Sequence, residues 1–114
     1  RPDERTRTAL EALYRYYRET AYMWSRAYRD VDEVSALREP LAAFDAWLDG
    51  VRDDLARAWA DCPDLRAALG HAVRFDTWRT LEREGLGDSA KAEAIVAWAN
   101  ALAGSVLPGD ESRG

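Results

Sequence analysis

Apolar side chains recur every three or four residues along almost the whole chain, and no stretch alternates between apolar and polar residues as a half-buried strand does. Good helix formers such as Ala, Leu, Arg and Glu fill the positions between them. These patterns predict an all-α protein, an antiparallel bundle of about five helices. The expected helices cover residues 8–19, 21–29, 40–60, 64–84 and 89–103.

Prolines and glycines mark the boundaries between these helices. Pro40 and Pro63 each suit the first turn of a helix, where a missing N–H costs no hydrogen bond. Gly85 is expected to adopt a left-handed conformation that ends a helix, with Leu86 folding back onto the last turn. Asp88 is a candidate N-cap for the last helix. The pattern leaves open whether residues 21–29 continue the first helix or bend away from it.

The length of 114 residues allows one hydrophobic core, so we expect one domain at residues 1–104 followed by a loose tail at 105–114. No apolar run approaches the ~20 residues of a membrane-spanning helix, and the N-terminal segment lacks the apolar stretch of a signal peptide. The single Cys62 cannot form an internal disulfide. These features predict a cytoplasmic protein, and the richness in Arg and Ala, with Lys91 as the only lysine, is typical of a GC-rich bacterial genome.

Several classes of function are disfavoured by the sequence. The net charge of -5 argues against nucleic-acid binding by this segment, because phosphate binding needs a concentrated excess of Lys and Arg. There is no glycine-rich phosphate loop, no G-x-S-x-G motif and no H-E-x-x-H motif. His71 is the only histidine, and the acidic residues at 30–33 lack the further ligand and glycine of a calcium loop. We therefore expect no enzyme activity, no cofactor and no metal site.

The segment AIVAWANALA, residues 94–103, contains Asn100 as its only polar side chain. A helix that is apolar on nearly every face must be covered all round. Either a second copy of the chain covers it in a homodimer, or it is the central helix of a monomeric bundle. The homodimer interpretation places the interface on the last two helices, with predicted contacts from Ala94, Ile95, Ala97, Trp98, Ala101 and Leu102.

Aromatic residues are unusually frequent, with five Trp, five Tyr and two Phe. Small-molecule sites are typically apolar cavities with a few polar groups, so rings from several helices could line one. His71 and Asp76 are candidate polar contacts, although an interior hydrogen-bonded histidine and an ion pair of Asp76 with Arg79 or Arg83 are the structural alternatives. The predicted ligand-binding residues are Tyr17, Trp24, Trp47, His71, Phe75, Asp76 and Trp78.

Three segments resemble the C-terminal domain of the TetR/AcrR family of transcription regulators. LRAALGHAVRFDTWRTLEREGLGDSAKAEAIVAWANAL (65–102) is similar to the closing helices of that domain. ALEALYRYYRETAYMWSRAYRDV (9–31) resembles the helices that follow the family's DNA-binding head, and AFDAWLDGVRDDLA (43–56) resembles its long central helix. The match lies in runs of residue types and carries no catalytic signature.

The resemblance implies an effector-sensing domain that forms a homodimer through a four-helix interface. A small lipophilic or aromatic molecule would bind in a pocket enclosed by the earlier helices and control DNA binding, most often as a repressor. No helix-turn-helix precedes Thr8, so DNA contact is expected only through a head outside this chain. A structural dimerisation module without ligand and a small helical-bundle enzyme remain the alternatives.

Overall fold

The computed structural model describes residues 1–105. They form five α-helices, which confirms the predicted all-α class and helix number, and a 3₁₀ turn, and contain no strand. The predicted tail at 105–114 lies outside the described residues except for Ser105. The elements in chain order are α1 (Pro2–Asp30), η1 (Ser35–Leu37), α2 (Arg38–Ala56), α3 (Pro63–Ala72), α4 (Phe75–Arg83) and α5 (Asp88–Ser105).

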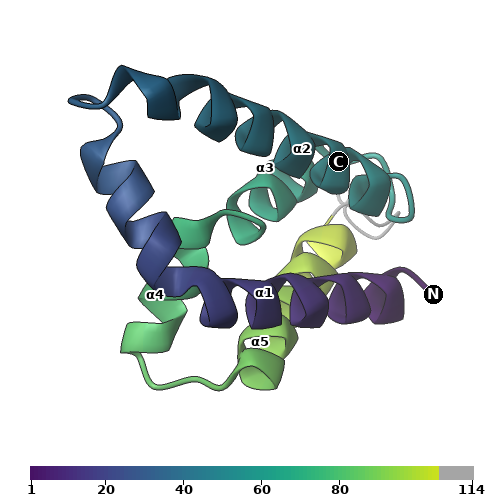
Figure 1. Ribbon diagram of the computed structural model, residues 1–114. Helices are drawn as coiled ribbons and strands as arrows, with labels where there is room; N and C mark the ends of the chain where they lie inside the picture. The colour runs from purple at the N-terminus through teal and green to yellow at the C-terminus, as the bar shows by residue number, and fades with distance from the viewer. Residues whose placement is uncertain (106–114) are drawn as a thin grey trace.

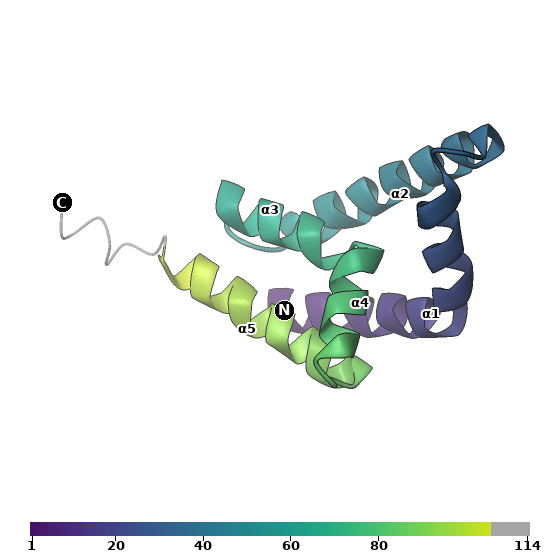
Figure 2. The ribbon, with the colours of Figure 1, turned by 90° about the vertical axis from the view of Figure 1, so that its left-hand side faces the viewer.

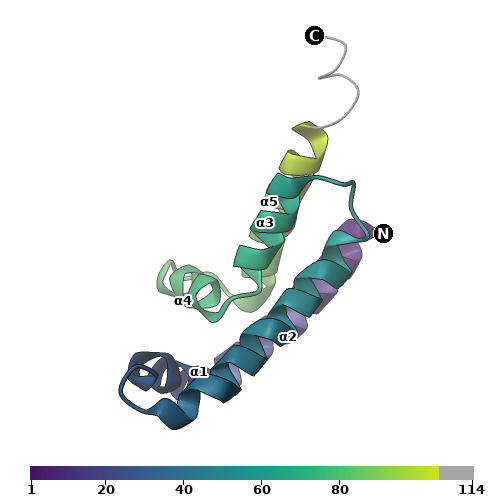
Figure 3. The same cartoon turned by 90° about the horizontal axis from the view of Figure 1, so that it is seen from above.

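The helices form two layers. In Figure 1, α2 and α3 lie above α1 and α5, and the view from above shows α1 alongside α5 and α2 alongside α3 (Figure 3). The short helix α4 runs across one end of the pair formed by α3 and α5 (Figure 3). The second half of α1 rises from the lower layer and leads into α2 in the upper one (Figure 1).

α1 is one helix that changes direction near its middle (Figures 1 and 2). The hydroxyl of Thr20 donates a hydrogen bond to the carbonyl oxygen of Tyr16 at 2.6 Å. Such bonds from Thr to the carbonyl four residues earlier compete with the helix ladder and often bend the helix. The predicted segments 8–19 and 21–29 are therefore continuous, and the bend carries the second segment toward α2.

The expected single helix at 64–84 is wrong, because the chain leaves the helix between Ala72 and Phe75 and forms α3 and α4. Arg74, which precedes α4, is extended, with φ -77° and ψ 148°. Hydrophobic periodicity alone does not detect this break, since apolar residues continue at helical spacing on both sides of it.

Two buried tyrosines from α1 stabilise the break. The hydroxyl of Tyr14 donates to the carbonyl oxygen of Ala72 at 2.7 Å, and that of Tyr17 donates to the carbonyl oxygen of Val73 at 2.7 Å. All four residues are fully buried. Carbonyl groups that lose their helical partners inside a core must find others, so the tyrosines make the turn between α3 and α4 possible within the core.

α2 ends at Ala56, four residues before the predicted end at 60. Trp59 therefore lies beyond the helix, and its indole N–H donates to the hydroxyl of Thr6 in α1 at 2.9 Å. Thr6 is fully buried. This hydrogen bond fixes the connection between α2 and α3 against the first turns of α1.

The turn between α4 and α5 confirms the predicted helix stop. Gly85 has φ 83°, the left-handed conformation that glycine adopts without strain. The N–H of Leu86 donates to the carbonyl oxygen of Leu81 at 3.3 Å, the six-to-one bond of a Schellman motif.

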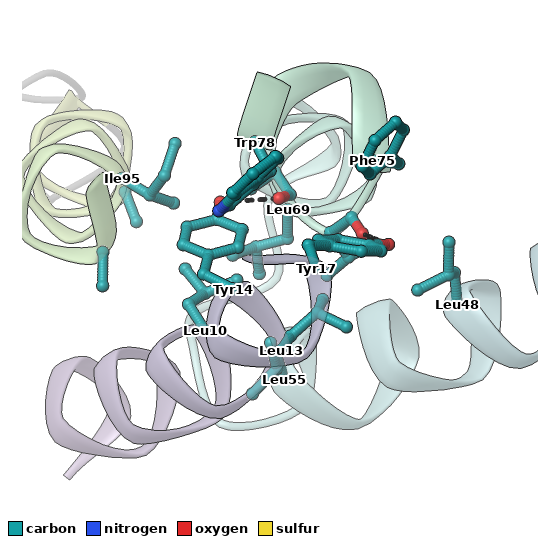
Figure 4. Packing of buried hydrophobic residues seen from close by; sticks show 14 of the residues in the cluster. Leu10, Leu13, Tyr14, Tyr17, Leu48, Leu55, Leu69, Phe75, Trp78 and Ile95 are labelled. Atoms are coloured by element: carbon teal, nitrogen blue, oxygen red, sulfur yellow. Dashed lines mark hydrogen bonds between the residues drawn. The ribbon is translucent and has the colours of Figure 1, made fainter. Parts of the chain in front are cut away.

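The core lies mainly between α1 and the helices α3, α4 and α5 (Figure 4). Leu residues of α1 and α3 fill its centre, and rings from α1 and α4 close one side. Its fully or almost fully buried members include Leu10, Tyr14, Tyr17, Leu48, Leu65, Leu69, Val73, Phe75 and Trp78.

A buried lysine joins α4 to α5 next to this core. The side chain of Lys91 is inaccessible to solvent, and its Nζ donates to Glu82 at 2.7 Å, to Asp88 at 3.0 Å and to the carbonyl oxygen of Leu86 at 2.8 Å. Arg18 of α1 pairs with the same two carboxylates, at 2.7 Å from Glu82 and 2.9 Å from Asp88. Chiefly through the hydrogen bond from Arg18, this network lowers the pKa of Asp88 to about 2.

Candidate functional site

An apolar groove runs between α1 and α2. Its volume is about 570 Å³, within the range of small-molecule sites. The α1 contributors are three or four residues apart and thus share one helix face, and so do the α2 contributors. The groove is lined by Ala9, Ala12, Leu13, Tyr16, Phe44, Trp47 and Val51.

Aromatic rings form one wall of the groove and continue beneath it. Trp47 is 56% exposed and Tyr16 is 39% exposed, which is unusual for rings of this size. The ring of Phe44 stacks against Trp47, with centroids 5.8 Å apart, and against Trp24, with centroids 4.2 Å apart. No charged side chain lines the groove, and the hydroxyl of Tyr16 and the indole N–H of Trp47 are its only side-chain polar groups. The surface therefore suits a neutral ligand with a flat apolar body.

The predicted ligand-binding residues do not surround one cavity. Trp47 alone lines the groove, and Trp24 lies under Phe44 with 9% of its surface exposed. Tyr17, Phe75 and Trp78 pack against one another in the core, with ring centroids 5.3 to 6.4 Å apart (Figure 4). These three rings therefore have a structural role in the core.

The two predicted polar contacts lie at the surface. Asp76 pairs with Arg79 at 2.6 Å, which is the expected structural alternative. His71 is exposed, with its Nδ1 3.2 Å from the hydroxyl of Thr77 and its ring 6.5 Å from that of Trp98. Because the chain breaks between α3 and α4, His71 and Phe75 belong to different helices and do not share one helix face.

Phe75 and Asp76 instead border a smaller and more polar cavity of about 280 Å³, together with Tyr28, Asp45 and Arg74. The hydroxyl of Tyr28 donates to Asp45 at 3.2 Å. Burial, followed by the nearby Asp45 charge, raises the pKa of Tyr28 to about 12, so the phenol stays protonated at neutral pH.

Sequence reasoning missed most of the groove residues. In α1 the groove is formed by Ala9, Ala12, Leu13 and Tyr16, whereas the core side of the helix carries Leu10, Tyr14 and Tyr17. The apolar face of α1 is thus wider than one neighbouring helix can cover. That width was the available signal for a second contact surface.

α5 keeps an apolar face outside the core. Ala94, Ala97, Trp98 and Ala101 are exposed and follow the spacing of one helix face, with Trp98 43% exposed. Two of the six predicted interface residues do not lie on this exposed face. Ile95 belongs to the core and is only 5% exposed, and Leu102 is partly buried against the core. The exposed face is therefore narrower than predicted.

No helix in residues 1–105 combines the length and the hydropathy that crossing a membrane requires. No protein-family model, no curated protein and no solved structure matches the chain. The functional argument therefore rests on the geometry of the groove and of the exposed face of α5.

Proposed function

We propose that this chain is the effector-binding and dimerisation domain of a TetR-like transcription regulator, and that a neutral lipophilic or aromatic molecule binds in the groove between α1 and α2. The observation that carries the proposal is the groove itself, with its exposed Trp47 and Tyr16 and its lack of charged lining residues. Ligand sites with this apolar lining and volume are common in proteins. DNA binding would belong to a helix-turn-helix head outside this chain.

The position of the groove suits a regulatory role. Its α1 residues, Ala9 to Tyr16, lie in the first half of the helix, which in the TetR family is the half nearer the DNA-binding head. A ligand that contacts both α1 and α2 would favour one spacing of these helices over others, and such differential binding is what shifts a conformational equilibrium. The ligand would thereby change the placement of the heads.

Binding can be tested with Nile red, a neutral lipophilic dye whose emission rises in apolar sites. The wild-type domain should give a saturable emission increase, and Ala12→Glu should weaken it at least tenfold, because a carboxylate in the apolar groove loses hydration. Ala12 is exposed, so the variant should fold. Ala42→Glu makes the same charge change on the opposite face of α2 and should leave the affinity unchanged. Absence of saturable binding, or equal losses in both variants, would contradict the groove site.

Self-association is proposed through the exposed face of α5. Alanines at 94, 97 and 101 permit close approach of a second helix, and Trp98 supplies a large apolar side chain. Ala97→Glu should convert a dimer into a monomer in multi-angle light scattering, whereas Ala42→Glu should keep the dimer mass. A wild-type domain that is monomeric at high concentration would refute the dimer. A dimer that binds no dye would instead favour a structural dimerisation module.

A further inference from the structure

A second cavity, between α2 and α3, has the opposite chemical character to the groove. Its volume is about 540 Å³. Most of its lining comes from one face of α3 and from Arg74 just beyond that helix, and Arg52 of α2 completes it. The lining residues are Arg52, Pro63, Arg66, Ala67, Gly70, His71 and Arg74, none of which lines the groove.

Two carboxylates on α2 hold the three arginines in place. Asp53 accepts from Arg52 at 3.1 Å and from Arg66 at 2.6 Å. Asp49 accepts from Arg74 at 2.5 Å and lies 3.3 Å from Arg52. These hydrogen bonds lower the pKa values of both carboxyl groups, so both are ionised at neutral pH. Three guanidinium groups against two carboxylates leave one positive charge at the cavity.

The arginines retain hydrogen-bond donors that their partners do not use. A guanidinium group has five N–H donors, yet Arg66 and Arg74 each donate to one carboxylate oxygen through Nη2. The Nη1 atom of Arg74 is buried and has no hydrogen-bond partner. Buried donors without partners are rare and destabilising in native proteins, so the side chain of Arg74 has an unmet demand for an acceptor.

A glycine in α3 shapes the cavity. A Cβ atom at Gly70 would lie 3.0 Å from Cδ of Arg52, closer than ordinary van der Waals contact. Glycine in a helix interior lowers helix stability relative to alanine. At this position it leaves room for the Arg52 side chain, whose Cδ packs against α3.

The hydrogen bonds of His71 define the state of its ring. The single hydroxyl proton of Thr77 is donated to the His71 carbonyl oxygen at 2.6 Å, so toward the ring Thr77 Oγ1 can only accept, from Nδ1 at 3.2 Å. Nδ1 therefore carries a proton, and Nε2 has no hydrogen-bond partner in the described structure.

We propose that this cavity binds the oxyanion group of a small molecule, a phosphate or a carboxylate, with Arg52, Arg66 and Arg74 as its donors. Guanidinium groups match both anions because two parallel N–H bonds can reach two oxygens at once. The net charge of -5 on the chain opposes a polyanion such as a nucleic acid more strongly than a compact anion that meets only the local arginines. The site is independent of the apolar groove and of its ligand.

The proposal can be tested by titrating ¹⁵N-labelled protein with pyrophosphate and, separately, with citrate at constant ionic strength. Saturable amide shifts at residues 66–74 are expected for at least one of them. A response to pyrophosphate alone identifies phosphate as the ligand group, and a response to citrate alone identifies carboxylate. Arg66→Gln should weaken the binding at least tenfold. Arg57→Gln, which removes an exposed arginine paired with Asp54 outside the cavity, should leave it unchanged.

Gly70→Ala supplies a second variant that should fold, because alanine favours the helix. The added methyl group should displace Arg52 and weaken anion binding while the circular dichroism of the helices is retained. Absence of saturable shifts with both anions, or equal affinities of Arg66→Gln and Arg57→Gln, would overturn the proposal. Shifts at 66–74 produced by a DNA duplex but by neither small anion would overturn it as well.

Discussion

Replacing Lys91 with alanine is expected to lower the free energy of unfolding by about 3–5 kcal/mol, the usual cost of breaking a buried ion pair. The Lys91 side chain is fully buried and supplies hydrogen bonds to two carboxylates and to the Leu86 carbonyl. Its Nζ also lies 5.1 Å from the ring centroid of Trp78, so the truncation removes packing as well as charge. For a domain of this size such a loss approaches the whole stability.

Urea unfolding followed by circular dichroism measures this effect. Lys91→Met, which keeps an unbranched apolar side chain, should lose less than Lys91→Ala, since it avoids most of the cavity. Arg83→Ala on the exposed side of α4 is the control and should change the stability by no more than about 0.5 kcal/mol. If Lys91→Ala were as stable as Arg83→Ala, the buried network would not contribute to the free energy of unfolding.

The double variant Tyr14→Phe/Tyr17→Phe is expected to lose about 2–6 kcal/mol, because each missing hydroxyl leaves a buried carbonyl without a partner at a cost of about 1–3 kcal/mol. Phenylalanine keeps the rings, so the packing should persist. Burial raises the pKa of both tyrosines well above its ordinary value, so both hydroxyls remain donors at neutral pH.

Thermal unfolding compares this double variant with Tyr16→Phe, whose hydroxyl has no hydrogen-bond partner in the described structure and whose ring is 39% exposed. Tyr16→Phe should match the wild type within about 0.5 kcal/mol. The double variant should also exchange its amide protons around Arg74 faster, because the break between α3 and α4 loses its support. Equal stability of the two proteins would show that the tyrosine hydroxyls do not hold this break.

Local sequence signals predicted the local features correctly. The all-α class, the left-handed Gly85 and the pair of Asp76 with Arg79, which was the structural alternative for that residue, all depend on neighbours within a few residues. The break at Val73 and Arg74 escaped prediction because Tyr14 and Tyr17 stabilise it from more than fifty residues away in the chain. Hydrophobic periodicity is a local signal and carries no information on hydrogen bonds between distant segments.

The role of Lys91 also depends on tertiary contacts that the sequence does not show. Lys91 is the only lysine in an arginine-rich sequence, and its position in the last helix predicts no particular role. Its burial depends on α4 turning back at Gly85 so that Glu82 and Asp88 come within reach. The role of this lysine therefore follows from the tertiary structure and not from the composition.

For the candidate site, the sequence supplied the abundance of rings but not their arrangement. Whether a ring belongs to the core or to a groove depends on how α1 and α2 are placed, which is set by the bend in α1 and by Trp24 stacking on Phe44. Trp47 was found because it is a large apolar residue in a helix, whereas Ala9 and Ala12 are too small to be noticed. The width of the apolar face of α1 would have been the better signal.

The most direct test of the account is a set of isotope-filtered nuclear Overhauser measurements on the labelled domain with unlabelled 1-naphthol, a neutral aromatic molecule. The groove predicts contacts from the ligand protons to the methyl groups of Ala12 and Val51 and to the indole protons of Trp47. Contacts confined to Trp98 and the exposed face of α5, or the absence of any contact at saturating ligand, would contradict a ligand site between α1 and α2.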